Sequence, residues 1–248
     1  MTDATRRARI RRPQFVIASI VLLGAVFMSQ TLMAGSVATL KGKVVGWEKL
    51  LPQVYADASK NDARRYNWRE PSPTVKQDFR KLSANVSRDV CIVALSAAGA
   101  QAHEPFVVKV TGGSLTPSTL VLSPGSRLSI KNVDPFPHEL YEVGNDKWAA
   151  NSVAPGSSRE WAAMTPGVHV IRDQLFGSVV MYVVVDPGAV EFAVPDHEGA
   201  FSMPLPPGDY TLKAFFDGKP TGKESPVHLG NAGFEMKEPM AVASGDSK

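Results

Sequence analysis

Short runs rich in Val, Ile, Leu, Thr and Phe fill the sequence after Asp89, and Gly, Pro, Asn and Asp separate them. This spacing is typical of an all-β sandwich or barrel, because such runs suit strands and the separating residues suit tight turns. The first eight runs predict one sandwich, with strands at Val90–Leu95, Phe106–Thr111, Thr119–Leu122, Arg127–Asn132, His138–Val143, Ser158–Ala163, Val168–Asp173 and Val179–Val185. After the turn residues Pro187 and Gly188, three further runs predict a smaller β unit, with strands at Val190–Val194, Ala200–Pro204 and Tyr210–Phe216.

The N-terminal part of the chain has the pattern of an export segment. Residues Phe15–Met28 carry no charge, a weaker uncharged stretch continues to Leu40, and the preceding arginines favour the cytoplasm. The strong apolar core has the length of a signal peptide, whereas the full run is long enough to span a bilayer. Small residues at Ser36–Ala38 offer a cleavage site, so both a cleaved signal and an anchor remain open. Either alternative places the remainder on the periplasmic side, and an uncleaved segment would contact the inner membrane through residues 15–34.

Charge and cysteine content exclude several classes of function. Of 27 basic and 24 acidic residues, five arginines and one aspartate lie in residues 1–13, which leaves 22 basic and 23 acidic residues elsewhere. Because the rest of the chain is almost neutral, nucleic-acid binding is not expected. The single cysteine, Cys91, excludes an internal disulfide and Cys-rich metal sites, and its apolar surroundings predict a buried side chain.

The sequence lacks the motifs of the common enzyme classes. No Gly-rich phosphate loop follows a predicted strand, no Ser-His-Asp order stands out, and no carboxylate pair has a glycosidase setting. The carboxylates of Glu139 and Glu142, on one predicted strand, are interpreted as solvated charges at a strand edge. We therefore expect a protein that is not an enzyme.

The stretch from Leu115 to His138 resembles the first half of a blue-copper cupredoxin, the plastocyanin-like family. It holds an apolar residue with a proline, a β strand, a turn at Gly125, an Asn-x-Asp loop at Asn132–Asp134, and a histidine in the place of the first copper ligand. With Pro166-Gly167 and the Val-rich last strand, the resemblance covers residues 88–186. It implies a Greek-key β-sandwich.

In that family the other three copper ligands lie in a Cys-x-x-His-x-x-Met loop after the Pro-Gly turn. Counting without gaps from Gly167, and back from Tyr182, reaches the same three positions. These positions hold, in order, Asp173, Phe176 and Val179. Since a type 1 centre needs a thiolate and two imidazoles, the resemblance implies a degenerate site in which only His138 remains. We expect no cofactor, with His138 and Asp173 as a hydrogen-bonded pair; the alternative is a copper or zinc site that uses this pair.

The residues around this degenerate site predict a binding surface. Phe136, Pro137 and Phe176 would form an apolar patch where the rim of a metal site would lie. The prediction is thus a non-enzymatic envelope protein that binds a protein or ligand there, or serves as a structural module. The rival function is copper binding or electron transfer through His138 and Asp173.

The second β unit, at residues 187–230, resembles the carboxypeptidase-regulatory-like or transthyretin-like modules. The residues that carry this resemblance are Asp196–Phe201 and Pro206–Ala214, with a Gly-x-Phe strand and a Pro-Pro-Gly-x-Tyr turn. Together the two units resemble bacterial envelope proteins labelled methylamine-utilisation or plastocyanin-like. The expected division is 1–38 signal or anchor, 39–87 membrane-proximal connector, 88–186 cupredoxin-like domain, 187–230 small β module and 231–248 flexible tail.

Overall fold

The computed structural model describes residues 37–53, 83–99 and 105–243, which are almost entirely β. The short helical pieces are η1 (Trp47–Lys49), α2 (Val86–Asp89) and η3 (Asp146–Trp148). None of the helices in these ranges is both long and apolar enough to cross a membrane. Residues 1–36 of the predicted export segment and most of the predicted connector lie outside the described residues. The predicted all-β class is confirmed.

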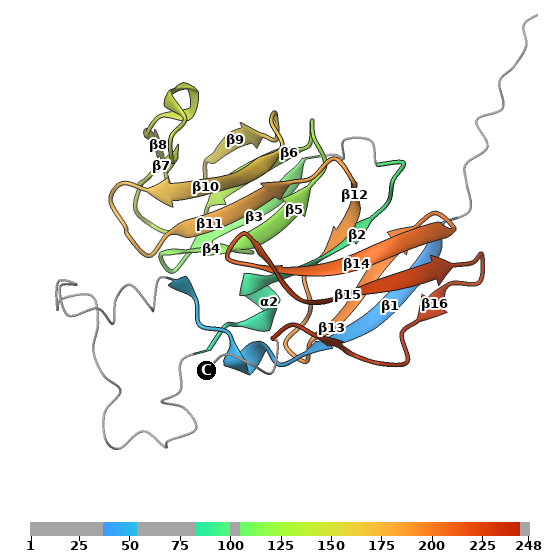
Figure 1. Cartoon of the computed structure of the whole chain (residues 1–248). Coiled ribbons are helices and arrows are strands. Elements are labelled where there is room, and N and C mark those ends of the chain that lie inside the picture. The colour runs from blue at the N-terminus through green and yellow to red at the C-terminus, as the bar shows by residue number, and fades with distance from the viewer. Residues whose placement is uncertain (1–36, 54–82, 100–104, 244–248) are drawn as a thin grey trace, which may run out of the picture. The chain divides into compact units, whose positions relative to one another are not determined.

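Two facing sheets form the first sandwich (Figure 1). One sheet has the strand order β4 (Ser114–Thr116), β3 (Phe106–Thr111), β6 (Arg127–Asn132) and β9 (Ser158–Ala162). The other has the order β5 (Thr119–Leu122), β11 (Val180–Val185), β10 (Gly167–Asp173), β7 (His138–Glu142) and β8 (Asn151–Val153). Alternate residues such as Val108, Ile130, Leu140 and Ile171 are fully buried between the sheets, because successive side chains of a strand point to opposite faces. The predicted β-sandwich is therefore present.

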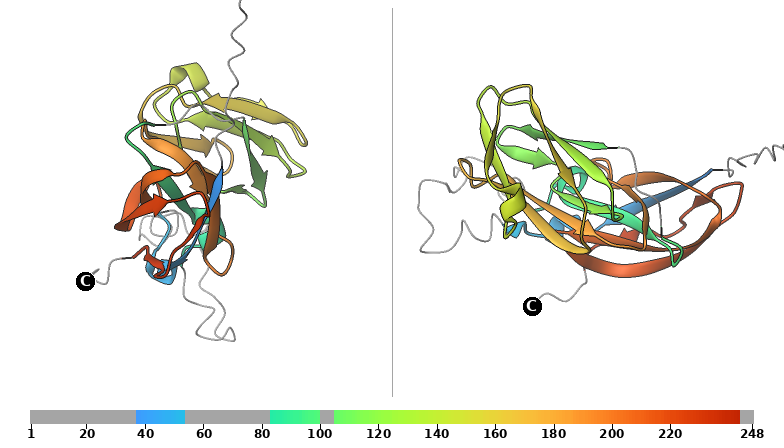
Figure 2. Two further views of the ribbon diagram at one scale, coloured as in Figure 1. Left: turned by 90° about the vertical axis from the view of Figure 1, so that its right-hand side faces the viewer. Right: turned by 90° about the horizontal axis from the view of Figure 1, so that it is seen from above.

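A second sandwich is built from both ends of the described chain. Its first sheet has the order β12 (Ala189–Ala193), β2 (Val90–Leu95), β14 (Gly208–Phe216) and β15 (Lys219–Leu229). Its second sheet has the order β13 (Ala200–Leu205), β1 (Ala38–Val45) and β16 (Phe234–Glu235), and β17 (Met240–Ala241) also pairs with β1. Figure 2 shows the blue strand β1 among the orange and red strands of the C-terminal part. The first sandwich is thus inserted between β2 and β12.

This pairing differs from the expected domain division. Residues Val90–Leu95 were expected in the first sandwich, but β2 pairs with β12 and β14. Ala38 was expected at the end of the export segment and the rest of β1 in a connector, but residues 38–43 of β1 pair with β13. A short apolar run predicts a buried strand without indicating which sheet contains it, so the sequence pattern alone does not identify the partner strands.

Strand β2 joins the two cores because both of its faces are buried. Cys91 and Val93 pack in the core of the first sandwich. Val90, Ile92 and Ala94 pack in the core of the second. A strand buried on both faces has a continuous apolar sequence, which is what Val90–Leu95 shows. The two sandwiches therefore share a structural element.

Two other expectations about the C-terminal part are wrong. Strand β15 has a mostly polar, exposed sequence with two prolines, and it lies at a sheet edge, where proline is tolerated. Its sequence pattern does not predict a strand. The tail expected to be flexible from Asn231 contributes β16 and β17 to β1, and Met240 and Val242 are buried. Paired strands of only two residues carry too little pattern to be recognised in a polar sequence.

We predict that residues 187–230 do not fold alone. In the full chain, β13 pairs with β1 and β14 pairs with β2, so the isolated segment lacks its partner strands and leaves its core face exposed to water. Circular dichroism of the purified segment should show no cooperative thermal transition, whereas the full chain should show one. A sharp melt of the isolated segment would contradict this dependence.

Candidate functional site

The candidate site lies where strands β7 and β10 bring two distant residues together. These strands are antiparallel neighbours, with Asp173 at the end of β10 opposite Leu140 in β7. His138 is the first residue of β7, so its side chain reaches the same end of the sheet. The His138 side chain is fully buried, and Nδ1 lies 2.5 Å from Oδ2 of Asp173. The structure thus brings together the two residues that the sequence predicted as a pair.

A second carboxylate, which the sequence analysis did not identify, binds the other side of the ring. Nε2 of His138 lies 3.1 Å from Oδ2 of Asp134, four residues earlier in the chain. Asp134 belongs to the Asn-x-Asp loop that was noted only as a family landmark. A carboxylate four residues before a predicted buried histidine is the signal that would have found it.

The two contacts constrain the hydrogen bonding of the ring. A neutral imidazole has one donor and one acceptor, and an ionised carboxylate only accepts, so a protonated imidazolium satisfies both contacts at once. Burial of Asp134 tends to raise the pKa of its carboxyl group, but the N–H groups of Gly113 and Gly112 and the ring of His138 lower it more, so the pKa lies below its ordinary value. Asp134 is therefore an ionised acceptor for a ring N–H of His138.

His138, Asp134 and Asp173 connect three loops at this end of the sandwich. The carboxylate of Asp134 accepts hydrogen bonds from the N–H groups of Gly112 at 2.6 Å and Gly113 at 3.0 Å. Both glycines have positive φ values, of 58° and 67°, which turn their N–H groups toward one acceptor. The other oxygen of Asp173, Oδ1, accepts from the N–H of Leu175 at 2.6 Å and of Phe176 at 3.2 Å. The histidine thus connects the β3–β4, β6–β7 and β10–β11 loops.

Aromatic rings cover the buried histidine. The ring centroids of Phe136 and Phe176 lie 4.9 Å apart, and each lies 5.2 Å from that of His138. Phe136 is 36% exposed, Phe176 is half-buried, and Pro137 is exposed. The structure therefore places the three residues of the predicted patch at one surface, directly above the candidate site.

The donor set at this site does not fit a type 1 copper centre. Both ring nitrogens of His138 are engaged by carboxylates, and Phe176 and Val179 supply neither imidazole nor thioether. Cys91 lies on β2, and burial raises the pKa of its thiol to about 12. Within the described ranges, no group of three His, Cys, Asp or Glu side chains is arranged to hold a metal ion.

A second histidine–carboxylate pair involves Glu142, farther along β7. Nδ1 of His169 lies 2.6 Å from Oε1 of Glu142, and Nε2 lies 2.8 Å from the carbonyl oxygen of Thr165. Oε2 of Glu142 accepts from Trp161 Nε1 and Asn145 Nδ2, both at 2.8 Å. The interpretation of Glu142 as a solvated edge charge is wrong, because a loop and β9 supply donors that cover it. This cluster is fully satisfied internally and supports the fold.

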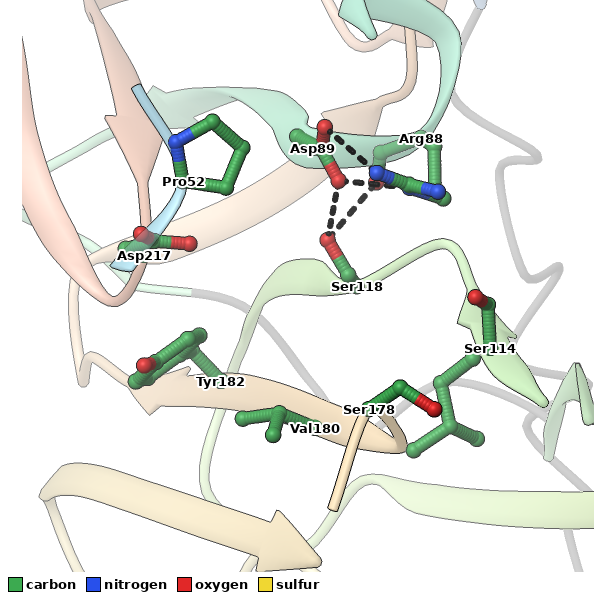
Figure 3. A pocket seen from close by; sticks show the side chains of 10 residues that line it. Pro52, Arg88, Asp89, Ser114, Ser118, Ser178, Val180, Tyr182 and Asp217 are labelled. Carbon is green, nitrogen blue, oxygen red and sulfur yellow. Dashed lines mark hydrogen bonds and ion pairs between the residues drawn. The ribbon is translucent and has the colours of Figure 1, made fainter. Parts of the chain in front are cut away.

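The junction between β2 and the first sandwich contains a pocket of about 110 Å³ (Figure 3). The guanidinium of Arg88 donates to the buried carboxylate of Asp89 at 2.7 and 3.1 Å. The hydroxyl of Ser118 donates to the same carboxylate at 2.8 Å. Across the pocket, burial raises the pKa of Asp217, which accepts from the N–H of Gln53 at 2.7 Å. The contact between Ser118 and Asp89 joins the first sandwich to the segment that leads into β2.

Comparison with known proteins gives likenesses of fold over part of the chain. No family model matches the sequence, and no curated protein matches it. Among solved structures, the chain is similar to a copper-containing nitrite reductase from Thermus scotoductus, with 20% identity over 37% of this chain and 25% of that chain, at a TM-score of 0.30. It is similar to a reduced amicyanin variant with 18% identity over 40% of this chain and 100% of that chain, at a TM-score of 0.31. For a purple cupredoxin from Nitrosopumilus maritimus the identity is 19%, the coverage 33% and 99%, and the TM-score 0.28.

We predict that Asp173→Ala strongly destabilises the protein. The substitution leaves the buried ring of His138 with one partner and frees the N–H groups of Leu175 and Phe176, and breaking such a buried pair costs about 3 kcal/mol or more. Urea unfolding of the full chain measures the change in free energy. Asp146→Ala, at an exposed position, is the control and should change it by less than about 0.5 kcal/mol. Equal effects of the two substitutions would contradict a stabilising role of the contacts among His138, Asp134 and Asp173.

We predict a pH-dependent effect of Glu142→Gln. Burial tends to raise the pKa of Glu142, but hydrogen bonds from Trp161, His169 and Asn145 lower it below its ordinary value of 4.5. The ionised carboxylate therefore stabilises the fold above pH 4.5, and this contribution is lost as the pH falls through the lower, folded-state pKa. The variant should be less stable than the parent at about pH 7 and closer to it at about pH 4 in urea unfolding.

Exposed Glu238→Gln is the matched control and should leave stability unchanged at both pH values. A Glu142→Gln deficit that stays constant or grows on acidification would contradict the assignment.

Proposed function

We propose that this chain is a non-enzymatic protein of the bacterial envelope whose cupredoxin-like sandwich lacks a type 1 copper site and binds another protein. The observation that carries the proposal is the engagement of both ring nitrogens of buried His138 by Asp173 and Asp134. A copper ligand needs an uncovered nitrogen, and here the protein supplies its own charged partners. The site is therefore proposed as a replacement for a metal, with a structural role.

In this proposal a protonated His138 holds the loops in place, as a bound metal ion would. It connects the carboxylate of Asp134 in the β6–β7 loop with that of Asp173 at the end of β10. These carboxylates hold the backbone of Gly112, Gly113 and Leu175. A binding surface gains from such rigidity, because less conformational entropy is lost when a partner binds. The surface presented is the apolar patch of Phe136, Pro137 and Phe176.

The second sandwich is proposed to support and present the first. Its C-terminal strands carry the resemblance to transthyretin-like modules, and β2 connects its core to that of the first sandwich. Such sharing fixes the inserted sandwich to its neighbour. No separate ligand is proposed for the second sandwich.

The proposed location is the periplasmic side of the inner membrane. The arginines of residues 1–13 oppose translocation, and the uncharged run that follows would export the remainder. We predict that a periplasm-dependent reporter fused after Lys248 is active and that a cytoplasm-dependent reporter at the same position is inactive. Replacing the five arginines with glutamate is the control that should weaken this orientation. Activity of the cytoplasmic reporter would contradict the proposed topology.

A copper-binding function is the second candidate, because imidazole and carboxylate groups gather around His138 and both can ligate Cu(II) or Zn(II). We predict that the full chain in detergent shows no tight, stoichiometric binding of Cu(II) in calorimetric titration. His228→Ala distinguishes weak Cu(II) binding at the surface from binding at His138, because His228 and Asp209 form an exposed pair. A tight site that survives His228→Ala but disappears in His138→Ala would establish the copper function and overturn the proposed one.

A further inference from the structure

A shallow groove of about 470 Å³ lies beside the candidate site, and two lysines line it. Lys109 on β3 and Lys131 on β6 are directly opposite each other in the sheet, and both are exposed. Their other neighbours in the row are Thr116 on β4 and Ser158 on β9. The row across the four strands therefore has hydroxyl, ammonium, ammonium and hydroxyl groups, all of which can donate hydrogen bonds.

The positive charge of this groove is not balanced within the described chain. No ion pair there involves Lys109 or Lys131, although like charges directly opposite in a sheet are unfavourable. Glu160 on β9 lies opposite Ser129, two residues along from the lysine row. Asp134 also lines the groove, but its oxygens accept from Gly112, Gly113 and His138. The lysine row is thus open to an anion from outside.

Apolar residues of the groove adjoin the apolar patch along the chain. Val133 and Pro135 form part of its lining, and Val133 is 51% exposed. The next residue in the chain is Phe136, which packs against Phe176. One continuous surface therefore offers ammonium groups at one side and apolar side chains at the other.

We propose that the partner of this surface is a protein segment in which acidic and apolar side chains occur together. Its carboxylates bind Lys109 and Lys131, and its apolar side chains pack on Val133, Pro135 and Phe136. The apolar contact supplies affinity, and the charge complementarity sets orientation and the rate of association. This inference rests on the proposed function, because it names the chemistry of the partner for the patch proposed above.

The test uses the full chain in detergent and two fluorescent synthetic peptides. In one peptide glutamate alternates with leucine, and in the other glutamine replaces every glutamate. Fluorescence anisotropy should show binding of the acidic peptide that weakens as sodium chloride is added, and little binding of the glutamine peptide. The double variant Lys109→Glu with Lys131→Glu should bind the acidic peptide with an affinity at least about tenfold lower than that of the parent.

The matched control reverses two exposed lysines of the second sandwich, Lys223→Glu with Lys237→Glu, and should bind as the parent does. Lys109→Gln with Lys131→Gln, a milder change, should give a smaller loss in the same direction. Circular dichroism melts of all variants show that each remains folded.

The outcomes separate the inference from the function on which it rests. If Phe136→Ser weakens peptide binding but the lysine variants do not, the acidic partner is overturned and the binding patch stands. If neither Phe136→Ser nor the lysine variants weaken peptide binding, both the inference and the proposed binding patch fail. If the glutamine peptide binds as well as the acidic peptide, the inference fails. Binding to vesicles of anionic phospholipid that depends on Lys109 and Lys131, without peptide binding, would overturn a protein partner in favour of a membrane surface.

Discussion

The end of the first sandwich depends on a single buried histidine held between two carboxylates. Without partners at both nitrogens, the fully buried ring of His138 would carry the cost of an unsatisfied polar group. With Asp173 and Asp134 in place, both ring nitrogens have a partner, and the two carboxylates in turn bind the backbone of the neighbouring loops. The exposed patch lies on these loops, and the lysine groove lies beside them. Their geometry therefore depends on the contacts of His138 with Asp134 and Asp173.

The second constraint on the structure is strand β2, which packs in both cores. Cys91 and Val93 face one sandwich, and Ile92 and Ala94 face the other. Because the chain leaves β2 to build the first sandwich and returns at β12, neither part is a simple N-terminal or C-terminal domain. Insertion of this kind links the rigidity of the binding end to the stability of the supporting sandwich.

The sequence predicts those features that depend on local pattern. Seven of the eight strands predicted for the first sandwich are observed there within about one residue of their predicted ends, whereas the short strands β4 and β8 were not predicted. The ungapped count from Gly167 and Tyr182 predicted that Asp173 pairs with His138, and these two side chains are in contact. The pairing of β1 with β13 was not predicted, because it joins segments far apart in the sequence. Glu142 was misinterpreted for a related reason, since its donors come from other elements and leave no mark on its own strand.

The central claim is that a protonated histidine and two carboxylates occupy the place of a metal site. Nitrogen-15 and proton NMR of the full chain, labelled at histidine and assigned with His138→Ala, tests it most directly. The account predicts that at neutral pH both ring nitrogens of His138 carry protons, with both N–H signals protected from solvent exchange and unchanged on addition of Cu(II). A neutral ring with one bare nitrogen, whose signal shifts or broadens selectively when Cu(II) is added, would contradict the account.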